Sequence, residues 1–124
     1  MKKILVVEDD PVNAHVLREF LRAYGYEALV APDGAKGVSM FAAERPDLVI
    51  IDVLLPFKNG YDVFEDLRAM ETGRKTPMFM MSAAFQRIAD VHEKLPLSER
   101  AQAYFTKPFD LHTLLDHVQF YAGS

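Results

Sequence analysis

Five short apolar runs, separated by stretches of helical periodicity, constrain the fold of this 124-residue chain most strongly. The first, third and fourth runs are apolar without alternation, which is typical of parallel strands covered on both faces. The second run is more mixed, which suits the edge of a sheet. We therefore predict strands at Lys3–Val7, Glu27–Ala31, Leu48–Asp52, Met78–Met81 and Ala103–Thr106.

Four amphipathic helices are predicted between and after these strands. Asp10, Asp33 and Asp110 can cap three of them, and Pro11 is favoured at a first helical position. The third helix is expected from about Gly60 to Met70. The apolar faces are expected at Val16, Leu17, Phe20, Leu21 and Tyr24; Ala35, Val38, Phe41 and Ala42; Val63, Phe64 and Leu67; and Leu111, Leu114, Leu115 and Val118. Alternation of strands and helices predicts an open, doubly wound α/β sheet with right-handed crossovers.

Length and composition indicate one ordinary globular domain over residues 1–124. The net charge is −4 and the chain has no basic tract, so we expect no direct contact with nucleic acid. Without cysteine, disulfides and thiolate metal sites are excluded. No apolar stretch approaches the ~20 residues of a membrane span, and the first residues lead straight into a strand. We expect a cytoplasmic domain with no membrane partner.

Polar side chains follow four of the predicted strands at the point where each ends. Ligands of such sheets bind beyond the carboxyl ends of the strands, where the strand order reverses. Clustered carboxylates about 4 Å apart repel by roughly a few kcal/mol, so they need a cation, and carboxylate oxygens suit Mg²⁺. The residues gathered there are Glu8, Asp9 and Asp10; Asp52; Ser82; and Lys107.

This set of residue types indicates phosphoryl transfer. Lys107 offers a point charge for a phosphoryl oxygen, and Ser82 offers a neutral donor. Asp52, beside a divalent cation, can act as the nucleophile toward phosphorus and form an aspartyl phosphate. The duller interpretations are that Asp10 is a helix cap, that Glu8 and Asp9 are solvated loop acids, and that Ser82 merely ends its strand.

The whole chain resembles a receiver domain of the bacterial response regulators, a CheY-like fold. The motifs that carry the resemblance, in family order, are Glu8-Asp9, Asp52 with Pro56 and Gly60, Ser82-Ala83, Tyr104 and Lys107-Pro108. The resemblance implies a five-stranded parallel sheet of order 2-1-3-4-5. It also implies a phospho-acceptor switch that, at most, catalyses its own phosphorylation and dephosphorylation.

The resemblance further implies roles for individual residues. Asp52 would take a phosphoryl group from a sensor histidine kinase or a histidine phosphotransferase. Mg²⁺ or Mn²⁺ would be held by Asp9, Asp52 and the backbone carbonyl of Leu54, with Glu8 acting through water. Lys107 and Ser82 would contact the phosphoryl group, and the Lys107–Pro108 bond would be cis. Tyr104 would be a switch aromatic; the alternative interpretation is a static core residue. The output would go to an effector protein or a fused output domain, through the surface of the fourth helix, last strand and last helix.

Three other functions are weighed against this one. A Mg²⁺-dependent phosphohydrolase with an aspartyl nucleophile needs a second acid where this chain has Leu54, and it needs a substrate-covering cap. A flavodoxin-like cofactor binder needs a phosphate-binding loop after the first strand. A degenerate receiver that binds partners without phosphorylation is opposed by the complete site, and only an assay separates the two.

Residues 85–102 depart from the family pattern. Ser82 and Lys107 lie further apart than in a typical receiver, and Arg100-Ala101-Gln102-Ala103 stands where glycine-alanine usually precedes the last strand. Because family members use this region for output or dimer contacts, whether the usual dimer forms here is left open. Our hypothesis is that this stretch forms a partner-specific surface.

Overall fold

The protein is a three-layer α/β molecule in the computed structural model, which describes residues 1–82, 100–108 and 110–123. All five strands are parallel, in the order β2-β1-β3-β4-β5, as the sequence predicts. They span β1 Lys3–Val7, β2 Glu27–Ala31, β3 Leu48–Asp52, β4 Met78–Ser82 and β5 Ala103–Thr106. Only the fourth strand differs from expectation, because Ser82 continues it by one residue.

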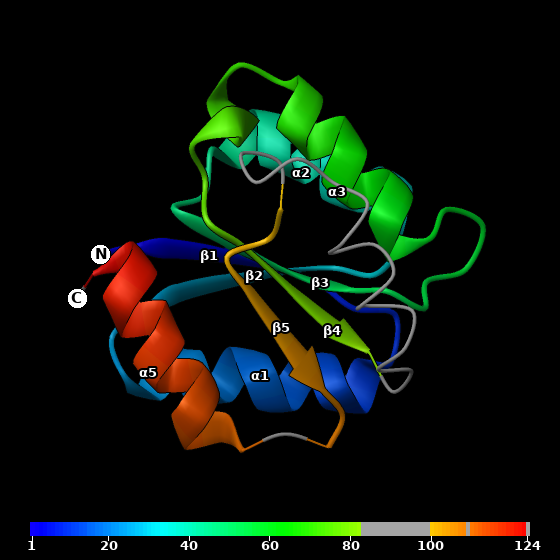
Figure 1. Ribbon diagram of the computed structural model, residues 1–124. Coiled ribbons are helices and arrows are strands. Elements are labelled where there is room, and N and C mark those ends of the chain that lie inside the picture. Colours follow the sequence, from blue (N-terminus) through cyan, green and yellow to red (C-terminus); the bar gives the residue numbers. More distant parts are fainter. Residues whose placement is uncertain (83–99, 109, 124) are drawn as a thin grey trace.

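The helices cover both faces of the sheet (Figure 1). They span α1 Pro11–Ala23, α2 Gly34–Glu44, α3 Gly60–Ala69, the short 3₁₀ helix η1 Thr72–Arg74, and α5 Leu111–Ala122. The predicted caps are confirmed: the side chains of Asp10, Asp33 and Asp110 accept from Val12, Lys36 and His112 backbone N–H groups. None of the helices in the described ranges is both long and apolar enough to span a bilayer.

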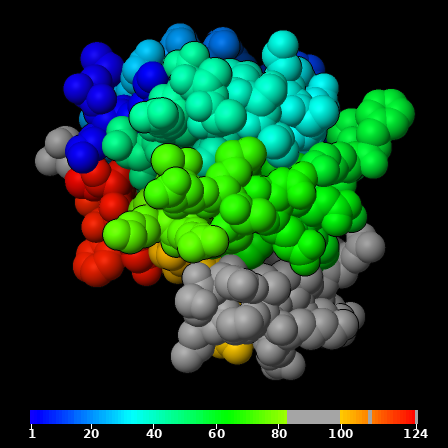
Figure 2. Space-filling view, turned by 90° about the horizontal axis from the view of Figure 1, so that it is seen from above, coloured from blue at the N-terminus to red at the C-terminus, as the bar shows by residue number. Residues whose placement is uncertain are grey.

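One apolar core lies on each side of the sheet. On one side α1 and α5 pack Leu17, Leu21, Leu114 and Val118 against the strands. On the other side α2 and α3 lie next to one another and cover the sheet (Figure 2). There Phe41, Val63, Phe64 and Leu67 are buried against the apolar strand residues.

Two of the predicted apolar faces are partly wrong. In α1, Val16 and Tyr24 are 44% and 47% exposed. In α2, Ala35 and Ala42 are exposed, and Gly34 and Gly37 are buried together with the predicted Phe41. A Cβ on Gly37 would lie 3.0 Å from a methyl group of Val7, so α2 packs closely on β1 at a position without a side chain. Hydrophobic periodicity cannot reveal such a position.

Candidate functional site

The carboxyl edge of the sheet brings together the acids that follow β1 and end β3. Val7 pairs with Ile51, so Glu8 continues β1 beside Asp52. Oxygen atoms of Glu8, Asp9 and Asp52 all lie within 4.8 Å of one another. The predicted convergence of these residues is therefore confirmed. Asp10 is outside this group, and its observed role is that of the α1 cap.

Glu8 is a buried carboxyl, only 2% exposed. Its backbone N–H donates to Ala31 O at 3.0 Å, which extends the pairing of β1 with β2 by one residue beyond the strand. Oε1 accepts from the Asp10 N–H at 3.1 Å, and Oε2 accepts from Lys107 Nζ at 3.0 Å. Burial raises the pKa of Glu8 to about 7; the Lys107 ammonium opposes this shift, and the nearby Asp52 adds to it.

Asp52 is 4% exposed and both of its carboxylate oxygens are engaged. Oδ1 accepts from the Leu54 N–H at 3.0 Å, and Oδ2 accepts from Lys107 Nζ at 2.8 Å. The loop behind it folds back through a bond from Gly60 N to Val53 O at 2.8 Å. A Cβ on Gly60 would overlap the carbonyl oxygen of Asp52 and lie 2.7 Å from Val53 Cα. Glycine is therefore required at position 60 for this placement of Asp52.

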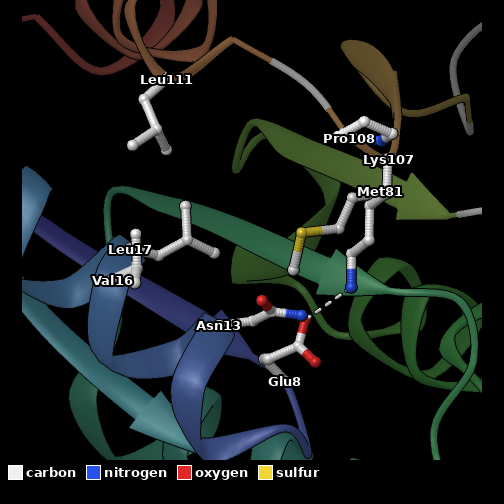
Figure 3. A pocket seen from close by; sticks show the side chains of 8 residues that line it. All are labelled: Glu8, Asn13, Val16, Leu17, Met81, Lys107, Pro108 and Leu111. Carbon is white, nitrogen blue, oxygen red and sulfur yellow. Dashed lines mark hydrogen bonds and ion pairs between the residues drawn. The ribbon is translucent and has the colours of Figure 1, made fainter.

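Lys107 bridges the two buried acids, Asp52 and Glu8, from the end of β5. Figure 3 shows its ion pair with Glu8. Burial lowers the pKa of Lys107, but the hydrogen bonds to Asp52 and Glu8 and the negative charges of these two acids together outweigh burial, so the net effect raises the pKa. Its backbone N–H donates to Ser82 O at 2.9 Å. The predicted cis peptide bond between Lys107 and Pro108 is present. The ammonium is thus held over Asp52, at the place predicted for it.

Ser82 and Tyr104 lie where the sequence places them, but their roles stay predictions. Ser82 is fully buried at the end of β4 and pairs with Thr106. Tyr104 is partly buried and packs against the core on the α2 and α3 side. Its hydroxyl accepts from the Ala101 N–H at 3.3 Å, and burial raises its pKa.

Leu54 contributes its backbone to the site, while its side chain is 48% exposed. The use of its carbonyl as a metal ligand stays a prediction. Residues 85–99 of the atypical segment lie outside the described residues, and so does the partner surface proposed there. From that segment the structure describes Arg100, Ala101 and Gln102.

The donor set fits a magnesium ion. Three carboxylates face one ammonium in this cluster, which leaves an excess of negative charge. Hard oxygen donors with an exposed member, Asp9, suit an ion that keeps several of its waters. A divalent cation would offset the repulsion that burial intensifies.

A cavity of about 530 Å³ opens beside Lys107, between α1 and the start of α5. Its walls are mostly apolar, and Glu8 and Asn13 add polar atoms close to the ammonium (Figure 3). The sequence does not predict this cavity, because the apolar periodicity of the first helix places Val16 on its inner face. Val16 lines the cavity instead, together with Leu17, Met81, Pro108 and Leu111.

Comparisons with known proteins agree on one family. Residues 4–119 match the model of the response regulator receiver domain. The chain is 31% identical over 118 residues to Protein PilH of Pseudomonas aeruginosa, covering 95% of each. It is 32% identical over 120 residues to the DNA-binding dual master transcriptional regulator RpaA of Synechocystis, where it spans 48% of that protein. The chain thus spans about half the length of several curated relatives that it matches.

Solved structures give the same result. The receiver domain of sensor histidine kinase PA1611 of Pseudomonas aeruginosa, with a magnesium ion coordinated in its active-site cleft, has a TM-score of 0.84 at 32% identity, covering 99% of this chain and 98% of that one. The response regulator TrrA of Thermotoga maritima, in complex with Mg²⁺-BeF, has a TM-score of 0.84 at 30% identity, covering 98% and 99%. With the fold, the acidic cluster and these matches, the chain belongs to the family of response regulator receiver domains, the signalling domains of two-component systems.

Proposed function

We propose that Asp52 is the phospho-acceptor of this receiver domain. The observation that carries the proposal is the position of its buried carboxylate, 2.8 Å from the Lys107 ammonium and grouped with Glu8 and Asp9. A carboxylate held this way has a fixed direction and a neighbouring positive charge for an incoming phosphoryl oxygen. Both features favour an in-line displacement at phosphorus.

The phosphoryl group would come from a phosphohistidine of a sensor kinase or histidine phosphotransferase. A carboxylate oxygen of Asp52 attacks phosphorus, a P–O bond forms, and the P–N bond to the imidazole breaks. The electron pair of that bond stays on the imidazole nitrogen. The product is an aspartyl phosphate, and no oxidation or reduction takes place.

Each neighbour of Asp52 has a part in this step. Lys107 moves its hydrogen bonds from the acids to a phosphoryl oxygen, and the Ser82 hydroxyl donates to another. Asp9, Asp52 and the Leu54 carbonyl would hold Mg²⁺ or Mn²⁺, with Glu8 acting through water. The ion would neutralise charge on the phosphoryl oxygens.

The response to phosphorylation would be a shift between two states of the domain. Ser82 follows Lys107 toward the phosphoryl group, and Tyr104 turns inward into the space that this opens. The change would reach a partner effector or a fused output domain through β5 and α5, together with residues outside the described ranges. The domain thus controls the binding of a partner and does not convert a diffusible substrate.

Incubation with acetyl phosphate and Mg²⁺, followed by intact mass, tests the proposal. The wild-type chain should gain one phosphoryl group, and the Asp52→Asn variant should gain none. Asp33→Asn is a matched control, because asparagine also caps a helix and Asp33 caps α2 away from the cluster. Labelling of Asp52→Asn at the wild-type level, or no labelling of the wild type, would contradict the proposal.

A further inference from the structure

Arg68, near the end of α3, is a buried guanidinium at the edge of the sheet opposite to Asp52. It is 7% exposed, and its charge lies over the ring of Phe64 at 5.0 Å from the centroid. It donates to acceptors in two stretches of the chain, 73–76 and 100–102: Gly73 O at 2.7 Å, Thr76 O at 2.7 Å, Gln102 Oε1 at 2.9 Å and Arg100 O at 3.3 Å. Arg68 therefore ties α3 to the chain that enters β5.

Gln102 forms hydrogen bonds to Met78, the first residue of β4, through both its backbone and its side chain. Its backbone N–H donates to Met78 O at 2.8 Å, and its Oε1 accepts from the Met78 N–H at 2.7 Å. The same Oε1 accepts from Arg68. We call Arg68 and Gln102 together the clamp.

The register of β5 decides where Lys107 lies. The strand has only four residues, Ala103–Thr106, and lies at the edge of the sheet. Its alternating burial opposes a slip by one residue, which would move Phe105 from the core on the α1 and α5 side to the opposite face of the sheet. A slip by two residues keeps the same faces and moves the strand by about 6.6 Å. Lys107 would then lose its hydrogen bonds to both Asp52 and Glu8. The alternation of buried and exposed residues in β5 therefore does not by itself fix the position of Lys107.

We propose that Gln102 and Arg68 are positioning residues, which hold β5 in the register that places the Lys107 ammonium against Asp52. The clamp holds the amino end of β5, and the hydrogen bond from Lys107 N to Ser82 O lies at the carboxyl end. The consequence for phosphorylation rests on the proposed function of Asp52. The register itself can be measured without any phosphoryl donor.

Substitutions of Gln102 separate positioning from simple stabilisation. Gln102→Glu keeps an acceptor for Met78 N and Arg68, whereas Gln102→Met has a similar size and no oxygen. Gln102 is exposed, so both variants should fold. Tyr26→Phe is the matched control, since it removes one hydrogen bond, from Tyr26 Oη to Gly123 O, away from β5.

Two measurements are made at a temperature where every variant is folded. The first is the hydrogen-exchange rate of the Lys107 backbone amide, relative to the amides of β1. The second is the rate of labelling by acetyl phosphate at saturating Mg²⁺. In Gln102→Met, Lys107 exchange should rise about tenfold beyond any change in β1, as expected when a buried amide loses its acceptor. Labelling should fall by about fivefold or more, and Gln102→Glu and Tyr26→Phe should stay within about twofold of the wild type.

The proposal is overturned if Lys107 exchange in Gln102→Met rises no more than that of β1, or if Gln102→Glu behaves like Gln102→Met. Either result would make the clamp a stabilising contact alone. Absence of labelling in the wild type would refute the function of Asp52 instead, and the exchange comparison would still decide the register.

Discussion

Replacing Phe57 by glycine should stabilise the protein, although it removes a large apolar side chain. Phe57 lies in the loop between β3 and α3, which projects from the body of the molecule (Figure 1). Its backbone has φ 66°, in the left-handed region, and its side chain is fully exposed. The strain of this conformation is therefore not offset by burial of the ring.

The magnitude follows from two opposing contributions. A left-handed conformation costs a residue with a Cβ about 1–2 kcal/mol. Glycine removes that cost but loses about 0.5–1 kcal/mol more in backbone entropy on folding. The net gain for Phe57→Gly should be about 0.5–1 kcal/mol. Phe57→Ala keeps the Cβ, so it should match the wild type within about 0.5 kcal/mol, as for other surface substitutions.

Urea denaturation without metal measures the difference. For a chain of this size, the gain corresponds to a midpoint about 0.3–0.7 M higher in Phe57→Gly than in Phe57→Ala. Arg45, at φ 48° and exposed, is a second test position, where the change from alanine to glycine should act in the same direction. A Phe57→Gly midpoint equal to or below that of Phe57→Ala would refute the reasoning.

Three further predictions concern the site. Gly60→Ala should cost about 1–3 kcal/mol in urea denaturation, because the new Cβ meets the Asp52 backbone; a wild-type midpoint would contradict the account of this loop. Asp9→Asn should weaken Mg²⁺ binding about tenfold or more in calorimetry. Asp10→Asn, which keeps the α1 cap, should leave Mg²⁺ binding unchanged. Equal effects of the two substitutions would show that Asp9 is not a metal ligand. Leu54→Asn should shorten the half-life of the aspartyl phosphate several-fold, because an amide can orient the attacking water; an unchanged decay of the label would argue against that.

Much of the fold could be predicted because its signals are local. Unbroken apolar runs such as Leu48–Ile51 mark buried parallel strands, and Asp33 and Asp110 mark helix starts through their own hydrogen bonds. The site could be predicted for a related reason. Parallel strands end at one edge, so charged residues that close separate strands must meet there.

The remaining features depend on contacts between distant segments. Gly34 and Gly37 are buried on the inward face of α2 beside Phe41, and no apolar pattern marks positions without side chains. Arg68 resembles a surface residue of α3 until its acceptors, which come from other segments, are known. The importance of Gln102 likewise arises only when β5 pairs with β4. Such features need the tertiary structure, because each residue alone would suit solvent equally well.

Chemical trapping of the phosphorylated residue tests the central claim most directly. Borohydride reduces an aspartyl phosphate to homoserine, so the wild-type chain is treated with acetyl phosphate and Mg²⁺, reduced, digested and sequenced by mass spectrometry. The account predicts homoserine at position 52, formed only with the divalent cation and absent after chelation. Homoserine at another aspartate, such as Asp9, or a phosphoryl group that reduction leaves in place, would contradict it.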